Sequence, residues 1–117
     1  MTHGSQLART EFDVELNGAG AGTHVISRAV ARDNSVQEFI SRVKGNADCN
    51  GHTECDAIIM DSATVKAIPE ILAEHPDASL IHEAAIGKIA GEQLIKLMTL
   101  GLTEKEAEEE IVNGFLR

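Results

Sequence analysis

The sequence predicts a mainly β fold that ends in a small region of two helices. Up to Gly87, short β-prone runs recur about every 10 to 13 residues between Gly, Asn and Asp. After Gly87, apolar residues recur at helical spacing instead. The 117 residues fit one domain, and with three Phe and no Trp or Tyr its core must be built from aliphatic side chains.

The first predicted strand covers residues 10–16, TEFDVEL, in which apolar and acidic residues alternate. Phe12, Val14 and Leu16 share one side of an extended chain, so this side is expected to face the core. The Gly-rich run NGAGAG follows at 17–22. A dinucleotide-binding loop would need a helix after these glycines, but residues 23–32 have a strand pattern. We therefore expect a corner between strands.

Four more strand candidates follow along the chain, at residues 35–45, 54–61, 63–71 and 78–87. Asn50 and Gly51 predict a turn before the strand at 54–61, and a short turn is expected between Pro69 and Pro76. This spacing is typical of a sandwich, a barrel or a β-solenoid, and periodicity does not choose among the three.

Two helices are predicted to close the chain. The first carries Leu94, Leu97 and Met98 on one face. It is expected to end at Gly101, because glycine favours the position after a helix. Thr103 and Glu106 have the spacing of a capping box at the start of the second helix. The apolar stripe of this second helix consists of Ala107, Ile111, Val112 and Phe115.

The formal net charge is −9, and the ten Lys and Arg residues form no run. Phosphate binding needs clustered cations, so nucleic acids and anionic membrane surfaces are disfavoured as partners. No apolar run approaches the roughly 18 residues of a transmembrane helix. Two cysteines do not make a disulfide framework. We therefore expect a soluble, cytoplasmic domain.

Cys49, His52 and Cys55 form the pattern C-x2-H-x2-C, which contains the side chains of a zinc site. A fourth ligand would come from His82 or His24, so a small zinc-binding domain is one hypothesis. Zinc ribbons carry paired motifs at both ends of the site, whereas this chain has one cluster. The alternative for Cys55 is a small buried apolar residue on a strand.

His82 and Glu83 stand together inside an otherwise apolar strand. Successive strand residues point to opposite faces, so at most one of the two faces the interior, where it would need a partner. The alternative hypothesis places the pair on a solvated outer surface. No serine-hydrolase elbow, HExxH motif or paired-carboxylate signature is present, so a hydrolase is not expected.

Several segments resemble the C-terminal part of the SufB/SufD family of iron–sulfur cluster assembly scaffold proteins. The most specific are Cys-Asp at 55–56, His-Glu-Ala at 82–84, Gly-Lys-Ile at 87–89, Gly-Glu-Gln-Leu at 91–94 and Ile-Val-Asn-Gly-Phe at 111–115. The resemblance covers residues 23–117. It implies a right-handed parallel β-helix over 9–88 and a small helical region over 89–117. Residues 1–8 are expected to be a disordered or expression-derived N-terminus.

The resemblance also implies a site. In the family a Cys followed by Asp is implicated in holding the nascent cluster, and Cys55 matches it. SufB-type members have a functional Glu in the second motif and SufD-type members a functional His, whereas this chain has both, as Glu83 and His82. This implies a scaffold, not an enzyme, that ligates an iron–sulfur cluster transiently where it pairs with itself or with a SufB/SufD paralogue. Cys49 and His52 are further candidate ligands.

In the family the C-terminal helices dock the ABC-type ATPase SufC. The resemblance therefore implies a partner surface that includes Glu104, Glu108, Ile111 and Phe115. The alternative is an acidic cap on the end of the solenoid. The chain has no Walker motif, so it is not expected to bind nucleotide itself. A metal-free β-solenoid that only binds partner proteins remains a further hypothesis. Family members have a longer β-helical body, so we expect an excised domain or a truncated homologue.

Overall fold

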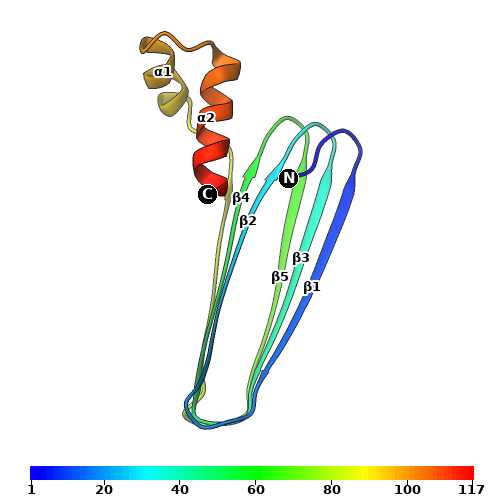
Figure 1. The fold of residues 1–117 in the computed structure, drawn as a ribbon. Coiled ribbons are helices and arrows are strands. Elements are labelled where there is room, and N and C mark those ends of the chain that lie inside the picture. Colours follow the sequence, from blue (N-terminus) through cyan, green and yellow to red (C-terminus); the bar gives the residue numbers. More distant parts are fainter.

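The computed structural model describes all 117 residues as two parallel β-sheets followed by two helices (Figure 1). The strands are β1 (Leu7–Leu16), β2 (Ala21–Ala31), β3 (Val36–Gly45), β4 (Cys49–Ile59), β5 (Thr64–Ala73) and β6 (Ser79–Gly87). The helices are α1 (Gly91–Thr99) and α2 (Glu104–Leu116). The prediction of a mainly β fold with two C-terminal helices is therefore confirmed.

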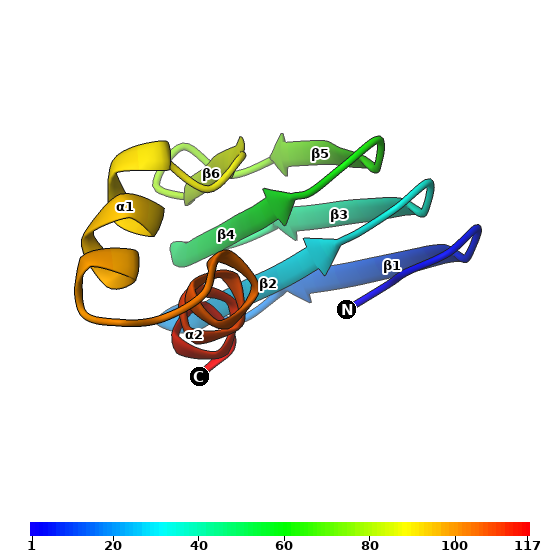
Figure 2. The ribbon, with the colours of Figure 1, turned by 90° about the horizontal axis from the view of Figure 1, so that it is seen from above.

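Consecutive strands alternate between the two sheets, whose strand orders are β1-β3-β5 and β2-β4-β6. Neighbours within a sheet are 28 or 29 residues apart in the chain, since Ala21 pairs with Cys49 and Leu7 with Val36. Figure 2 shows the sheets as facing layers, with α1 and α2 outside the β2-β4-β6 sheet. This winding brings residues almost 30 positions apart into direct contact.

The core lies between the two sheets. Its buried cluster consists of Leu16, Val43 and Cys49. Val14, Val43 and Ile71 occupy paired positions on β1, β3 and β5, so aliphatic side chains form a row across the sheet. The alternation predicted for residues 10–16 is confirmed, because Val14 and Leu16 belong to this core and the acids between them lie outside.

Polar side chains stack at the corners where the chain passes from one sheet to the other. Gly4, Asp33 and Asp61 all have φ of 58°. The backbone N–H of Gly4 donates to Oδ2 of Asp33 at 2.7 Å, and that of Asp33 donates to Oδ2 of Asp61 at 3.1 Å. Gly and Asp tolerate this left-handed conformation better than most residues. The recurring Gly and Asp punctuation of the sequence thus marks corners of the fold.

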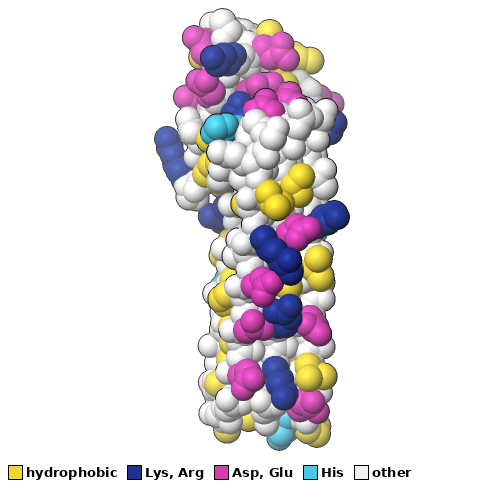
Figure 3. Space-filling view, turned by 90° about the vertical axis from the view of Figure 1, so that its right-hand side faces the viewer, with side chains coloured by type: hydrophobic (Ala, Val, Ile, Leu, Met, Phe, Trp, Pro, Cys, Tyr) yellow, Lys and Arg dark blue, Asp and Glu magenta, His cyan; other side chains and the backbone are white.

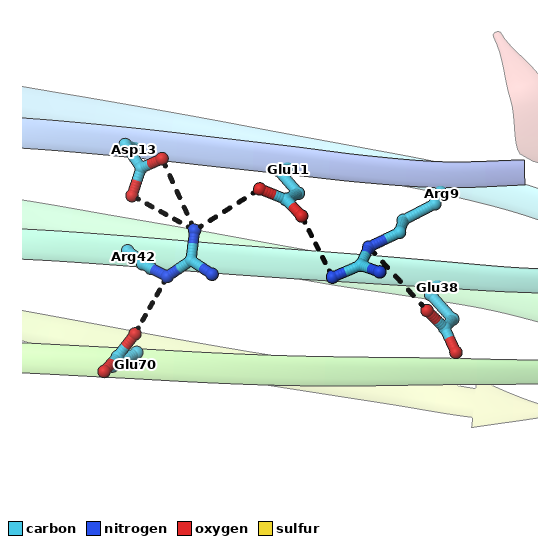
Figure 4. Close-up of polar contacts among 6 residues, drawn as sticks. All are labelled: Arg9, Glu11, Asp13, Glu38, Arg42 and Glu70. Carbon is cyan, nitrogen blue, oxygen red and sulfur yellow. Dashed lines mark hydrogen bonds and ion pairs between the residues drawn. The ribbon is translucent and has the colours of Figure 1, made fainter.

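The outer face of the β1-β3-β5 sheet carries alternating charges (Figure 3). Nε of Arg42 lies 3.0 Å from Oε2 of Glu70, and its Nη1 lies 3.5 Å from Oδ2 of Asp13 (Figure 4). Arg9 and Glu11 extend this network with a contact of 3.0 Å. The carboxylates, Asp13 foremost, raise the pKa of Arg42. Exposed ion pairs contribute little to stability, so we interpret the network as a solvated surface.

Residues 1–8 differ from the expected disordered N-terminus. Thr2 bridges to Ala31, and its hydroxyl oxygen lies 2.9 Å from that of Ser35. β1 already begins at Leu7. The bridge from Thr2 to Ala31 therefore adds one short backbone pairing beside the end of β2.

The turn predicted at Asn50 and Gly51 is wrong, because both residues lie inside β4. A Cβ on Gly51 would come within 2.9 Å of Cδ2 of Leu80, so the glycine leaves space for a core leucine on the next strand. Local turn propensity is overridden here by packing.

Pro69 also lies within a strand, β5, which is an edge strand, where proline is tolerated. The predicted turn is formed at Pro76.

The helices begin and end as predicted. Gly101 follows α1 with φ of 98°. At the start of α2 the amide of Glu106 donates to the hydroxyl of Thr103 at 3.2 Å, and the Thr103 amide donates to the Glu106 carboxylate at 2.8 Å. α2 contacts β2, and Nη1 of Arg28 donates to the carbonyl oxygen of Arg117 at 3.0 Å. Neither helix is long and apolar enough to cross a membrane.

Candidate functional site

β4 presents its odd-numbered residues to the space between the sheets. Cys49 and Cys55 are both 1% exposed, whereas His52 points to the outer face. Six residues of extended chain separate the two thiols by about 20 Å. As the side chains lie in the structure, no three His, Cys, Asp or Glu residues converge on one point where a metal ion could be held. A zinc site shared by Cys49, His52 and Cys55 is therefore excluded.

Cys55 lies between Ser27 on β2 and Ala84 on β6 in the strand register. Burial and the carboxylate of Asp56 raise the pKa of the Cys55 thiol above its ordinary value of 9.0, and the Ser27 side chain opposes this in part. The thiol is thus protonated at neutral pH, and a metal ion would displace its proton. Ala84 is exposed on the edge strand β6, so its methyl group is the side chain next to Cys55 on the way to the open edge.

His82 shares the inner face of β6 with Ala84 and pairs with Thr53 of β4. Both ring nitrogens of His82 and the hydroxyl oxygen of Thr53 are buried without a hydrogen-bond partner. Such atoms are rare in folded proteins, because each loses its hydration without compensation. Strand spacing places the Cα atoms of His82 and Cys55 about 8 Å apart. A thiol and an unsatisfied imidazole therefore share one stretch of the interior.

Glu83 points the other way, to the outer face of β6. Its Oε2 lies 3.3 Å from Nε2 of His52, although the direction of this contact does not make a hydrogen bond. The prediction that at most one member of the His82–Glu83 pair faces the interior is confirmed. Within one chain, Cys55 and His82 lie on one side of the sheet and Glu83 on the other.

The residues expected to form a partner surface on the helical region differ in exposure. Ile111 and Phe115 are half-buried, and Glu108 lines a small cavity with Lys88, while Glu104 is exposed. Within the helical region, the most exposed apolar side chains are those of Leu100, Ile95 and Met98, at the end of α1 and on it. Sequence reasoning missed Ile95 and Leu100 because they lie outside the predicted stripe. The available signal was that the sequence offers no second apolar stripe that could cover these two side chains.

Comparisons with known proteins agree on one family. Residues 1–115 match the family model described as SUF system FeS cluster assembly, SufBD core domain. The chain is 38% identical over 105 residues to an iron–sulfur cluster assembly SufBD family protein of Methanothermobacter thermautotrophicus, covering 88% of this chain and 26% of that protein. A SufBD family protein of Methanocaldococcus jannaschii is 40% identical over 104 residues, with 88% of this chain and 33% of the relative covered.

A SufBD family protein of Staphylococcus saprophyticus is 33% identical over 99 residues, or 79% of this chain. The chain spans about a quarter to a third of the length of the first two relatives. The family model, however, covers almost every residue of the fold described above. The chain therefore belongs to the SufBD family of iron–sulfur cluster assembly proteins.

Proposed function

We propose that this chain is part of a scaffold, rather than an enzyme, on which an iron–sulfur cluster is built before transfer. Membership of the SufBD family supports a role in cluster assembly. One observation carries the ligation proposal: Cys55 and His82 face the same interior from neighbouring strands, and one of these strands is the edge strand β6. The nascent cluster is the cargo of this site.

The ligand types suit a scaffold. A thiolate holds iron tightly, whereas replacing further thiolates by imidazole or carboxylate weakens the set. Both nitrogens of His82 are without a partner, so either is available to iron. Cys55 must lose its proton when iron binds, which makes release of the cluster easier as the pH falls. A scaffold requires this reversibility.

We propose that the remaining ligands come from a second chain, either another copy or a SufB/SufD paralogue. β5 and β6 each have one unpaired edge, and such edges pair readily with other strands. Glu83 lies on β6 with a side chain that is 59% exposed, so it is accessible to a partner at this edge. The two sheets would then be turns of a right-handed parallel β-helix.

The helical region is proposed to dock the ABC-type ATPase SufC. Its apolar contact would come from Ile95, Met98 and Leu100, which are exposed. Acidic residues of α2, Glu104 and Glu108 among them, would surround this contact. Ile111 and Phe115 are half-buried, so we assign them to holding α2 in place. Any nucleotide would be bound by the ATPase.

Reconstitution tests the cluster proposal. The protein is incubated anaerobically with Fe²⁺ and sulfide, and the visible charge-transfer absorption is recorded. Cys55→Ser is expected to abolish this absorption, because the principal ligand is lost. Cys49→Ser is the matched control: Cys49 is equally buried on the same strand, but it lies in the apolar cluster and should leave the absorption unchanged.

Far-UV circular dichroism verifies that both variants are folded. Full absorption in folded Cys55→Ser would overturn the proposal and favour a metal-free module that binds partner proteins. Equal loss in the two variants would also contradict it, because the effect would then not depend on the position of the thiol.

A further inference from the structure

Two histidines stack on the outer face of the β2-β4-β6 sheet, away from Cys55. His24 of β2 and His52 of β4 are direct partners in the strand register. Their ring centroids are 5.0 Å apart, and the ring planes differ by 5°. Nε2 of His52 has no hydrogen-bond partner although it is shielded from solvent. Two imidazoles are therefore held side by side, and Nε2 of His52 is free to bind a further group.

Two carboxylates lie next to this pair. Glu54, two residues after His52 on the same face, is the direct register partner of Glu83 on β6. Neither carboxylate forms an ion pair with Lys or Arg, and the nearest contact is the 3.3 Å approach of Glu83 to His52. Like charges placed directly opposite each other on a sheet are destabilising. A bound cation would remove this repulsion.

We propose that this face binds one divalent first-row transition metal ion, with His24, His52 and Glu83 as ligands and Glu54 as an additional carboxylate. Imidazole nitrogens with carboxylate oxygens suit Zn²⁺, Fe²⁺ and similar ions. The site goes beyond the cluster proposal and shares only Glu83 with it, because Cys55 and His82 lie on the other face of the sheet.

The ion must draw the side chains together, since they do not already converge on one point. Two nitrogens bound tetrahedrally to one metal ion at about 2.05 Å are about 3.4 Å apart. The rings now stand 5.0 Å apart, so a modest rotation about the side-chain bonds brings one nitrogen of each into range. The backbone needs no change, because the strand register already places the two histidines opposite each other.

Titration with Co²⁺ alone tests the site. The Cys55→Ala variant is used, so that the thiol adds nothing to the spectrum and the iron–sulfur site is disabled. We expect about one Co²⁺ per chain, visible ligand-field bands of tetrahedral Co²⁺ and no sulfur-to-metal charge transfer. His24→Gln and His52→Gln should each lower Co²⁺ affinity by about tenfold or more, because each removes a ligand. Both residues lie on the outer face, so the variants should fold.

His75→Gln is the matched control, because His75 lies in a turn where its Nδ1 accepts the backbone N–H of Asp77 at 3.1 Å. Its Co²⁺ affinity should be unchanged. Equal affinity in His52→Gln and the parent would overturn the proposal, as would a stoichiometry near zero. Retention of Co²⁺ binding in Cys55→Ala, alongside loss of the iron–sulfur chromophore, would separate this site from the cluster site.

Discussion

Cys49 and Cys55 have the same burial on the same strand but different surroundings. Cys49 packs with Leu16 and Val43 in the apolar cluster, where its sulfur fills space. Cys55 lies beside a serine and one strand from the open edge, where the methyl group of Ala84 is the next side chain. The two thiols therefore have different roles, and exposure alone would not distinguish them.

The pKa of Cys55 predicts how stability depends on pH. Since this pKa is raised in the folded chain, the folded state keeps a proton that the unfolded state loses above pH 9.0. The contribution of Cys55 to the free energy of unfolding should therefore stay constant below that pH and decrease as the pH rises through the pKa of the folded state. Urea unfolding between about pH 8 and pH 10.5 should show a smaller decline in Cys55→Ala than in the parent.

Cys49→Ala serves as the control for the loss of a buried thiol. It should keep the decline of the parent, because Cys55 is intact. A decline of the same size in Cys55→Ala and the parent would contradict the assignment of this pH dependence to Cys55.

At the scale of elements, the end of β3 depends on a glycine. A Cβ on Gly45 would lie 3.0 Å from Cβ of Ala78 and 3.0 Å from Sγ of Cys49. The Cβ of Ala78 has no rotatable bond that could move it away, and the sulfur of Cys49 is packed in the apolar cluster with Leu16 and Val43. The close approach of the two sheets at this corner therefore requires the absence of a side chain.

Gly45→Ala is expected to lower the free energy of unfolding by about 1–3 kcal/mol, the usual cost of overpacking. Urea unfolding measures this as a lower midpoint with an unchanged slope. Gly22→Ala is the matched control on β2, because a Cβ there would meet only the carbonyl oxygen of Asn50, at 3.6 Å. Equal stability of Gly45→Ala and Gly22→Ala would show that the corner can relax.

At the scale of the whole molecule, the chain is elongated and thinly packed. It measures 54 × 30 × 17 Å, with a radius of gyration of 17.5 Å, against about 13 Å for a compact domain of similar length. Its accessible surface of 7047 Å² exceeds the roughly 6,200 Å² expected for its mass. β5 and β6 each leave one strand edge unpaired. The shape therefore supports our proposal of partners at the strand edges and at the exposed helix.

Docking of the ATPase is predicted to depend on α1. Ile95 is 62% exposed, and burying such a side chain contributes about 1.5–3 kcal/mol, or roughly ten- to hundredfold in affinity. Ile95→Glu should therefore weaken retention of the ATPase SufC in a pull-down by at least about tenfold. Ile26→Glu, an equally drastic change at an exposed isoleucine of β2, should leave retention unchanged.

Unchanged retention in Ile95→Glu would remove α1 from the contact. Loss of retention in Glu104→Gln alone would instead assign the contact to α2, which contributes the partner surface that the resemblance implied. Circular dichroism of each variant verifies that the helices are still formed.

The sequence by itself determined the local features. Alternation assigned Val14 and Leu16 to the core, and it limited the His82–Glu83 pair to one inward side chain. The capping box at Thr103 and the glycine after α1 were predictable because caps depend on residues only three or four positions apart. The motifs around Cys55 and His82 were enough to predict the family.

Only the tertiary structure decided which side chains meet across strands. Cys55 lies beside Ala84, Thr53 beside His82, and His24 beside His52, each pair being 28 or 29 residues apart. These pairings depend on the number of residues in each turn and corner, because a shift of one residue would move every side chain to the opposite face. Local propensity carries no information on that count. The separation of Glu83 from Cys55 was therefore visible only once the strands were in register.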